Sequence, residues 1–360
     1  MPEIAYQHIA GVLLGTAVGD ALGVPRENLS PRRAERLFGA PPLRQCFLLG
    51  RGMISDDTEH TCMLGQALLR APNDPERFAR SLAWSLRWWL LGVPAGIGRA
   101  TFRSLVKLWI GFPPTRSGVW SAGNGPAMRS ALLGVCLGHE RERLTAYVRA
   151  ATRLTHTDPR AERGALLVAL AAHYGATAGP NGVTADGYLK LVREALPDMD
   201  AELAGILARL EEHIARQAPA VELAAALSLQ RGVTGYIYHT VPLALYCWLR
   251  SPTDFRTAVE EVIALGGDAD TTGAITGAIA GATLGEQGIP QTWLDRIREW
   301  PCSVAWMRRL AEKLARQFPA QGVGEASGSA ALCWPALLPR NLLFFAIVLG
   351  HVARRLLPPY

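Results

Sequence analysis

Two short acidic segments contain residue types that could bind metal ions. The first is SDDT at residues 55–58 and the second is DADT at residues 268–271, so each combines two carboxylates with a hydroxyl group. Each opens a stretch with helical periodicity, and the N-terminus of a helix favours nearby negative charge. Four clustered carboxylates would still repel one another unless cations compensate them. Because every donor atom is oxygen, we expect two hard divalent ions, Mg²⁺ or Mn²⁺, rather than zinc or copper.

The first acidic segment alone also has a purely structural interpretation. Ser55 could cap the following helix, with Asp56 and Asp57 favouring its first turn. The second segment repeats the same chemistry inside GGDADTTG at residues 266–273, where flanking glycines let backbone and ligands approach closely. This repetition favours one shared metal site over two unrelated helix caps.

Glycines spaced four residues apart recur in two of the expected helices. A helical glycine costs up to about 1 kcal/mol relative to alanine, so such rows need a compensating benefit. Close approach of the two helices would supply it, and would bring the segment after Gly19 toward the second acidic segment. The alternative is two independent small-residue faces against the core. The two rows are Gly11, Gly15, Gly19 and Gly23, and Gly273, Gly277, Gly281 and Gly285.

Helical periodicity dominates the chain, and no series of alternating strands with hairpin turns interrupts it. We expect an all-α protein, a compact multi-helix orthogonal bundle with an additional C-terminal helix. The tryptophans of the third helix, Trp84, Trp88 and Trp89, are expected in the core, although one ring could line the cleft. The expected helices cover residues 6–22, 57–70, 75–91, 100–110, 125–138, 141–153, 158–175, 184–195, 199–216, 220–228, 236–250, 254–265, 271–285, 291–298, 301–316 and 339–356.

Changes in composition near the C-terminus divide the chain into three parts. Residues 1–316 are expected to form the catalytic domain. Residues 317–330 are rich in Gly, Ala and Ser and predict a flexible linker. Residues 331–360 predict a hydrophobic and basic helical extension that packs on the main domain. Its apolar run, Leu342–Gly350, is shorter than the ~20 residues of a membrane span, so we expect none.

Composition narrows the class of protein. The chain has 360 residues, 49% of them hydrophobic, which is ample for a buried core. The net charge of +6, from 37 basic and 31 acidic residues, is spread without a Lys/Arg-rich run. A basic nucleic-acid-binding protein would rest on charge alone, so no stable nucleic-acid complex is expected. Six cysteines without CxxC spacing predict free thiols in the cytoplasm. No signal peptide is expected, because Asp20 interrupts the first apolar segment.

Five motifs occur in an order that resembles one known family. They are GDALGVPRE at 19–27, SDDT at 55–58, GNGPAMR at 123–129, THTD at 155–158 and GGDADTTGAITGAIAG at 266–281. Over residues 6–300 the chain resembles ADP-ribosylglycohydrolases of the dinitrogenase reductase-activating type. The resemblance implies an all-α fold with a binuclear Mg²⁺ or Mn²⁺ centre. It also implies release of ADP-ribose from an ADP-ribosylated protein or other substrate, by attack of water at the anomeric carbon of the distal ribose.

The resemblance also implies roles for residues of the acidic segments and for Glu27. Ser55 stands where the family usually has threonine, and it keeps the hydroxyl group. Either Asp57 or Glu27 would take the proton of the attacking water, and the sequence does not choose between them. From the residues alone, Glu27 would be an exposed side chain in a turn. The implied metal ligands are Ser55, Asp56, Asp57, Asp268, Asp270 and Thr271.

A second set of residues is implied to bind the substrate. The glycine-rich turn at 123–125 could present N–H groups to phosphate, or could be a structural helix cap with Pro126 at the first helical position. His156 matches a family histidine of the substrate cleft, although a histidine there is often a satisfied polar residue. Met128 and Tyr236 could equally be helix packing. The implied substrate-binding residues are Gly123, Asn124, Gly125, Met128, His156 and Tyr236.

One loop departs from the family pattern. Relatives that release ADP-ribose from arginine carry an Asp where this chain has Ala95 or Gly96, in the loop at residues 94–98. The departure disfavours arginine as the modified residue, unless another acid supplies the contact. It also keeps a second function open, an ADP-ribose-binding module without turnover. The linkage, the target and the oligomeric state are left open.

Overall fold

A pair of buried antiparallel helices, α1 (Pro2–Gly23) and α15 (Ala269–Leu284), forms the centre of the molecule. A Cβ atom added to Gly15 would lie 2.1 Å from the carbonyl oxygen of Gly277, and one on Gly277 would lie 2.2 Å from that of Gly15. No side chain fits between these backbones. The expected close pairing of the glycine rows is therefore confirmed, and the alternative of two independent faces is excluded.

The ends of the two glycine rows differ from the rest. Gly23 packs against Ala269, whose carbonyl oxygen would lie 2.3 Å from an added Cβ, and also against the backbone of Asp270. Gly285 ends α15 with a φ of 72°, and its backbone still contacts α1, since a Cβ added to Gly11 would lie 3.0 Å from the carbonyl carbon of Gly285. The pairing thus carries the C-terminal end of α1 to the start of α15, which holds the second acidic segment.

The computed structural model describes the backbone of residues 2–319 and 324–357, with side chains from residue 5 onward in these ranges. Within them the chain is all-α, and strand-like pairing is limited to isolated bridges. The other helices are α2 (Pro31–Phe38), α3 (Asp56–Arg70), α4 (Pro75–Leu91), α5 (Arg99–Trp109), α6 (Pro114–Ser117), α7 (Ala131–Leu137), α8 (Arg141–Arg153), α9 (Pro159–Ala178), α10 (Ala185–Ala195), α11 (Ala201–Ala215), α12 (Ala220–Ala226), α13 (Ile237–Arg250), α14 (Phe255–Ala264), α16 (Gln291–Leu294), α17 (Val304–Gln317) and α18 (Leu337–Arg355), with 3-10 turns η1 (Val24–Arg26), η2 (Ala127–Arg129), η3 (Glu286–Gly288) and η4 (Trp334–Ala336).

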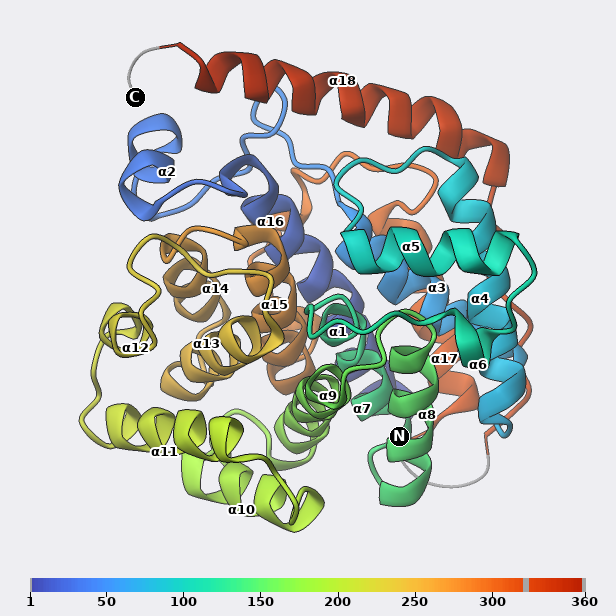
Figure 1. Cartoon of the computed structure of the whole chain (residues 1–360), viewed down its shortest axis with the longest axis horizontal. Coiled ribbons are helices and arrows are strands. Elements are labelled where there is room, and N and C mark those ends of the chain that lie inside the picture. The colour runs from blue at the N-terminus through green and yellow to red at the C-terminus, as the bar shows by residue number, and fades with distance from the viewer. Residues whose placement is uncertain (1, 320–323, 358–360) are drawn as a thin grey trace.

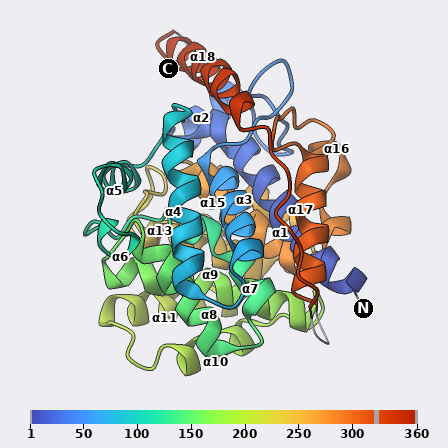
Figure 2. The ribbon, with the colours of Figure 1, turned by 90° about the vertical axis from the view of Figure 1, so that its right-hand side faces the viewer.

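The remaining helices surround the central pair. Helices α3 and α17 pack on α1, whereas α9, α13 and α14 pack on α15. Helices α10 to α12 lie on the side of α13 and α9 away from α4 and α17, as Figure 1 shows. Figure 2 shows α4, α3 and α17 side by side. This arrangement places the start of α3 next to the start of α15.

Two expected helices differ from the structure, and one observed helix was not expected. The expected helix at 125–138 is interrupted, because η2 precedes α7 and Pro126 lies before the 3-10 turn rather than at the first position of an α-helix. The expected helix at 291–298 ends at Leu294. Helix α2 was not expected, and only Ala34 of its eight residues is buried. A mostly charged short helix has too weak an apolar pattern for sequence periodicity to reveal.

The tryptophan cluster of α4 is divided between core and surface. Trp89 is buried, and its Nε1 donates a hydrogen bond to Glu59 Oε2 at 2.6 Å. Trp84 and Trp88 are 55% and 46% exposed, so the expectation that they belong to the core was wrong. Their rings pack edge to face on each other at the surface.

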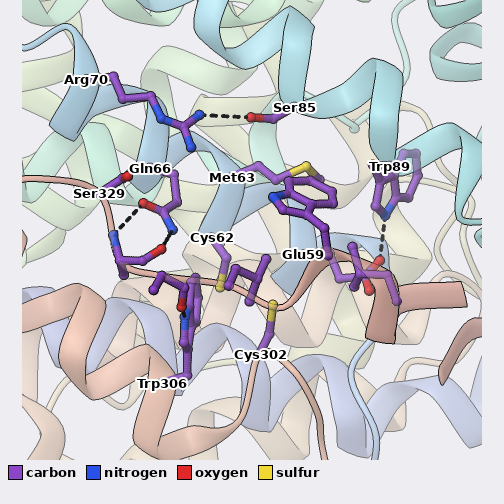
Figure 3. A pocket seen from close by; sticks show the side chains of 15 residues that line it. Glu59, Cys62, Met63, Gln66, Arg70, Ser85, Trp89, Cys302, Trp306 and Ser329 are labelled. Carbon is purple, nitrogen blue, oxygen red and sulfur yellow. Dashed lines mark hydrogen bonds between the residues drawn. The ribbon is translucent and has the colours of Figure 1, made fainter. Parts of the chain in front are cut away.

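The segment before α18 is held against α3 and α17. The side-chain amide of Gln66 donates to the carbonyl oxygen of Ala330 at 2.6 Å and accepts from its N–H at 2.9 Å, as Figure 3 shows. Trp306 Nε1 donates to the carbonyl oxygen of Ala331 at 2.7 Å. A cavity of about 150 Å³ lies between this segment and helices α3 and α4. Residues 320–323 of the expected linker lie outside the described residues, and its flexibility stays a prediction.

In the described residues, two helical segments are long and apolar enough to cross a membrane by length and composition. Ala5–Arg26 is 94% buried inside the molecule, as expected for a core helix. Trp334–Arg355 is 22% buried, and this apolar stretch is longer than the run Leu342–Gly350 that the sequence singled out. Length and composition alone do not separate a membrane helix from a docked one, so the expected absence of a span stays a prediction.

Candidate functional site

The two acidic segments meet at the N-termini of α3 and α15. Ser55 caps α3, since its side-chain oxygen accepts a hydrogen bond from the N–H of Asp57 at 3.4 Å. Both carboxylate oxygens of Asp57 lie 3.2 Å from the hydroxyl of Thr271, which donates to them. The capping interpretation is therefore confirmed, and the two acidic segments meet, while the shared metal site stays a prediction.

Two glycines with positive φ set the position of Asp268. Gly266 and Gly267 have φ values of 66° and 77°, a region that disfavours residues with a Cβ. The N–H of Gly267 donates to the carbonyl oxygen of Leu29 at 2.7 Å, so this turn lies against the end of the GDALGVPRE motif. The side chain of Asn124 then donates to Asp268 Oδ2 at 2.5 Å. These hydrogen bonds connect the glycine-rich turn at 123–125, the second acidic segment and the chain just after the GDALGVPRE motif.

The electrostatics of the cluster are unfavourable for ionised carboxylates. Burial raises the pKa of Asp57 well above its usual value, and the charges of Asp20 and Asp56 raise it further. Burial likewise raises the pKa of Asp270, helped by the charge of Glu27. Buried like charges without a compensating cation favour protonation. A bound cation would remove this penalty.

The donor set suits hard divalent ions. It contains carboxylate and hydroxyl oxygens and no thiolate or imidazole, the combination that Mg²⁺ and Mn²⁺ prefer. In the described part of the chain, no group of three or more His, Cys, Asp or Glu side chains is already arranged to hold an ion. The carboxylates are instead hydrogen-bonded to Thr271 and Asn124, and those bonds would have to open for ligation. The candidate ligands lie near enough for hydrogen bonds or charge interactions within the set, and they are Ser55, Asp56, Asp57, Asp268, Asp270 and Thr271.

Asp20 is a member of the cluster that the sequence interpretation missed. It is fully buried on α1 and accepts hydrogen bonds from the N–H of Ser55 at 2.9 Å and from the N–H and hydroxyl of Thr58 at 3.2 and 2.5 Å. Burial raises its pKa to about 6, although these hydrogen bonds act in the opposite direction. An acid within an otherwise apolar helix was the available signal, because a buried carboxylate needs donors.

Glu27 lies at the edge of the cluster rather than in solvent. It is half-buried, and its Oε1 accepts a hydrogen bond from the side chain of Asn28 at 2.9 Å. Burial raises the pKa of Glu27, and the charge of Asp268 raises it further. The exposed-turn interpretation is therefore wrong, because η1 and the Gly266–Gly267 turn bring this residue inward.

The glycine-rich turn packs directly over His156. A Cβ added to Gly123 would lie 3.0 Å from His156 Nε2, and one on Gly125 would lie 3.2 Å from Cε1 of the same ring. His156 is 3% exposed and its Nδ1 is 2.9 Å from the hydroxyl of Thr155. Burial, reinforced by the charge of Arg129, lowers the pKa of His156 to about 3. The ring is therefore neutral at physiological pH.

The remaining candidate residues lie around this turn in different roles. Asn124 connects it to the acidic cluster, as described above, and also donates to the hydroxyl of Thr240 at 3.0 Å. Met128 is 4% exposed, and its carbonyl oxygen accepts from Thr61 at 3.2 Å, so its side chain belongs to the core. The backbone of Tyr236 pairs with Gly123, while its hydroxyl donates to Glu202 at 2.8 Å.

A cavity of about 70 Å³ opens beside the acidic cluster. Glu27, Ser55, Asp56 and Asp270 line one side of it, and Ala95 and Gly96 come from the loop that departs from the family pattern. This loop therefore lies at the acidic cluster, where it brings no carboxylate. The other lining residues are Val24, Phe47, Phe344, Val348, His351, Val352 and Arg355, so within the described residues no further acid compensates for the missing one.

Comparison with known proteins agrees with this arrangement. Residues 1–324 match the model of the ADP-ribosylglycohydrolase family. The chain is 31% identical over 304 residues to an uncharacterized protein of Archaeoglobus fulgidus. This alignment covers 80% of this chain and 90% of the relative. It is 28% identical over 302 residues to the ADP-ribosyl-dinitrogen reductase glycohydrolase of Rhodospirillum rubrum, in an alignment that covers 81% of this chain and 90% of the relative.

The fold is also similar to that of a solved protein. An ADP-ribosylglycohydrolase-related protein complex superimposes with a TM-score of 0.63 and 26% identity, covering 87% of this chain and 99% of that one. The family match spans the glycine-paired helices, both acidic segments and the turn over His156. By sequence and by fold, this chain belongs to the ADP-ribosylglycohydrolase family.

Proposed function

We propose that this protein is a metal-dependent hydrolase that releases ADP-ribose from an ADP-ribosylated substrate. It would cleave the N- or O-glycosidic bond at the anomeric carbon of the distal ribose. The observation that carries the proposal is the meeting of Asp57 and Thr271, which joins two acidic segments into one buried, oxygen-rich cluster. Membership of the ADP-ribosylglycohydrolase family supports the same activity.

Six oxygen donors would hold two divalent ions, Mg²⁺ or Mn²⁺. When bound, these ions would compensate the carboxylate charges and supply Lewis acidity toward the ribose and the attacking water. Asp20 would keep the start of α3 in place through the N–H groups of Ser55 and Thr58, and Asn124 would orient Asp268. The proposed ligands are Ser55, Asp56, Asp57, Asp268, Asp270 and Thr271.

Glu27 is the better candidate for the general base. Both oxygens of Asp57 are engaged with Thr271, and Asp57 does not line the cavity. Glu27 lines the cavity, and burial raises its pKa toward the range in which a carboxylate accepts a proton effectively. Water would transfer a proton to Glu27 as its oxygen bonds to the anomeric carbon and the bond to the leaving group breaks.

The turn at 123–125 would bind the ADP-ribose moiety. Its three residues are half-buried, and the side chain of Asn124 places the turn beside the acidic cluster. His156 is not an imidazolium at physiological pH, because burial lowers its pKa. This supports a binding role rather than proton transfer. Tyr236 would contribute its ring edge, because its hydroxyl is already engaged by Glu202.

The partner would be an ADP-ribosylated substrate, without a stable nucleic-acid complex. Four of the six free cysteines are buried, which is compatible with the proposed cytoplasmic location.

Release of free ADP-ribose tests the proposed function. The protein is incubated with ADP-ribosylated serine, arginine and nucleic acid, in Mg²⁺, in Mn²⁺ and in EDTA, and ADP-ribose is separated by chromatography. We expect release from at least one conjugate with metal and none with EDTA. Tight calorimetric binding of ADP-ribose with no release from any conjugate would favour the binding module instead.

A further inference from the structure

The outer side of α18 is apolar along its whole length. Six large side chains on it follow one another at alternating spacings of four and three residues, which places them on one side of a helix. Each of them is between 45% and 72% exposed. Figure 1 shows α18 lying across the molecule above α2 and α5, with one side uncovered. We call these six residues the apolar face, and they are Leu338, Leu342, Phe345, Leu349, Val352 and, at the C-cap, Leu356.

Polar side chains of α18 point in the opposite direction, into the protein. Arg340 is 3% exposed and forms ion pairs with Glu299 at 2.7 Å and with Glu59 at 3.4 Å. Asn341 is 1% exposed and donates to the carbonyl oxygen of Gly92 at 2.8 Å. A helix at a water-exposed surface normally has its charged and polar side chains on the outer side. The polarity of α18 is therefore typical of a helix whose outer side contacts a second apolar surface.

Contacts along the length of α18 keep this orientation fixed. In its second half, Nε2 of His351 lies 2.7 Å from the carbonyl oxygen of Phe47, and the two rings stack with centroids 5.3 Å apart. Arg355 donates to the carbonyl oxygen of Pro25 at 3.0 Å. Rotation of the helix to bury the apolar face would break these contacts and the ion pairs of Arg340. The apolar face therefore stays outward while α18 is docked.

The apolar surface continues from α18 onto α4. A groove of about 980 Å³ lies between the two helices near the start of α18. Trp84, Trp88 and Leu91 line one side of it, and Trp334 and Leu338 line the other. Indole rings are amphipathic, so they are favoured at the boundary between an apolar medium and water. An exposed apolar surface that extends over two helices marks an interaction site.

The charged side chains at the two ends of this surface are basic. At the C-terminal end, Arg354 is exposed, and Arg33 donates to the carbonyl oxygen of Arg355, which brings α2 with its three arginines and one glutamate to this end. At the other end, Arg70 lines the groove. No acidic residue occurs in residues 334–357, and none lines the groove. The surface is therefore complementary to an apolar partner that carries negative charge.

Charge and polarity together decide among the possible occupants. A second copy docked through the same surface would bring basic side chains of the two chains together, with no acid of the surface to pair with them. Nucleic acid would contact the arginines but would leave the apolar face in water. An anionic lipid bilayer supplies hydrocarbon for the apolar face and phosphate groups for the arginines at its ends.

We propose that α18 binds this protein to the surface of an anionic lipid membrane. The helix lies in the plane of the membrane surface, with the apolar face inserted into the boundary of head groups and acyl chains and with Trp84 and Trp88 at the same level. It does not span the bilayer, because Arg340 and Asn341 hold its inner side on the protein. This attachment is independent of the proposed hydrolase activity.

Binding to lipid vesicles tests the proposal. The full chain is mixed with vesicles of phosphatidylcholine alone, or of phosphatidylcholine with phosphatidylserine, and the bound fraction is measured by flotation. We expect at least about tenfold tighter binding to the vesicles that contain phosphatidylserine, because several arginines approach the anionic surface. Leu342→Gln combined with Leu349→Gln should weaken binding to these vesicles about 100-fold, because two inserted leucine side chains are lost.

Matched variants separate membrane insertion from general damage. Val221 is 61% exposed on α12, away from the apolar face, so Val221→Gln should leave vesicle binding unchanged. Arg354→Gln should reduce the preference for phosphatidylserine about fivefold, the contribution of one arginine near an anionic surface. Both leucines of the double variant are exposed, so its circular dichroism spectrum should match that of wild type.

Several results would overturn the proposal. They are a lack of wild-type binding to either kind of vesicle, equal binding to both kinds, and undiminished binding of the double variant. Light scattering without vesicles tests the second copy as the occupant. Dimerisation of wild type that the double variant abolishes would replace the membrane by a second copy. None of these measurements uses ADP-ribose release, so failure of this proposal and failure of the proposed function are distinguishable.

Discussion

Asp57 lies in unfavourable electrostatic surroundings. It is 2% exposed, and its neighbours in the cluster include Asp20, Asp56 and Asp268, whose charges act on it. A carboxylate with a raised pKa holds its proton more tightly when folded than when unfolded. Its contribution to stability is therefore lost as pH rises from the ordinary Asp value of about 3.9 through the raised pKa. Cations in the site would reverse this effect.

Replacing Asp57 should therefore separate stability from function. In EDTA at pH 7 we expect Asp57→Asn to unfold about 2 °C higher than wild type, because a buried carboxylate is removed and the amide still accepts from Thr271. At pH 3 this difference in unfolding temperature should vanish, because Asp57 is then protonated in the folded wild type. Mg²⁺ should raise the unfolding temperature of wild type and not of the variant. Thermal unfolding followed by circular dichroism measures each difference.

The control for this prediction is an exposed acid in the first turn of another helix. Asp186 on α10 fits, and Asp186→Asn should change stability by no more than about 0.5 kcal/mol. A Mg²⁺-induced rise in the Asp57→Asn variant as large as that in wild type would contradict the assignment of Asp57 as a ligand.

Glu27 gives a second prediction at the residue scale. Glu27→Gln should lower kcat by about 10²- to 10⁴-fold, the usual contribution of a general base, while ADP-ribose binding measured by calorimetry changes little. Asn28 is the matched neighbour, because it is exposed and donates to Glu27. Asn28→Ala should lower kcat much less than Glu27→Gln does. A Glu27→Gln variant with near-normal kcat would return the base role to Asp57.

Much of the site was predictable from residue types, and the reasons differ by residue. Ser55 to Asp57 and Asp268 to Thr271 form short motifs whose chemistry is local, so the sequence exposes them. Asp20 was missed because its partners, Ser55 and Thr58, are supplied by another helix. The inward position of Glu27 depends on a turn at Gly266–Gly267, which no local pattern around Glu27 reveals.

At the scale of elements, the glycine-lined contact between α1 and α15 determines where the site forms. A Cβ on Gly277 would lie 2.2 Å from a backbone oxygen of Gly15, and neither backbone can yield without separating the helices. Separation would also move Asp268, which precedes α15, and Glu27, which follows η1 at the end of α1. Stability and catalytic geometry thus depend on the same contact.

A pair of glycine substitutions tests this dependence. We expect Gly277→Ala to lower the free energy of unfolding by about 3 kcal/mol or more, because overpacking meets rigid backbone. Gly205 lies in α11 with open space around it, so Gly205→Ala should raise stability by up to about 1 kcal/mol. Urea unfolding measures both. Equal changes in the free energy of unfolding for the two substitutions would contradict the claim that the close contact at Gly277 has no room for a Cβ atom.

Element boundaries were less predictable than element existence. The helix pair was predictable because glycines four residues apart lie on one face of a helix, where their cost in helix stability is offset when a second backbone packs against them. The break between η2 and α7 was not, because the turn at 123–125 is positioned by Gly235 and Thr240 from the far side of the site. Helix α2 was missed because its exposed charged residues contribute no apolar period.

At the scale of the whole molecule, one buried arginine connects the C-terminal extension to the catalytic part. Arg340 on α18 pairs with Glu59 on α3 and with Glu299, whose Oε2 also accepts from the N–H of Ile54 at 3.1 Å. Ile54 precedes the first acidic segment. The extension therefore supports the residue that precedes the first acidic segment, in addition to lining the cavity.

Removing this connection should be costly. Arg340→Gln would leave two buried carboxylates without a cation, and we expect a loss of about 3–5 kcal/mol in the free energy of unfolding. Arg309 is exposed on α17, and Arg309→Gln should change stability by less than about 0.5 kcal/mol. Urea unfolding of both variants checks the difference. A small effect of Arg340→Gln would mean that α18 is only loosely attached.

The most direct test of the central claim is ADP-ribose release measured across a titration of Mg²⁺ or Mn²⁺, with wild type and Asp57→Asn in parallel. The acidic cluster predicts that wild type releases ADP-ribose only as metal is added, and that the variant is at least about 100-fold slower at saturating metal. Equal release by wild type in EDTA and in metal, or undiminished release by Asp57→Asn, would contradict the claim that this cluster is a metal-dependent hydrolytic site.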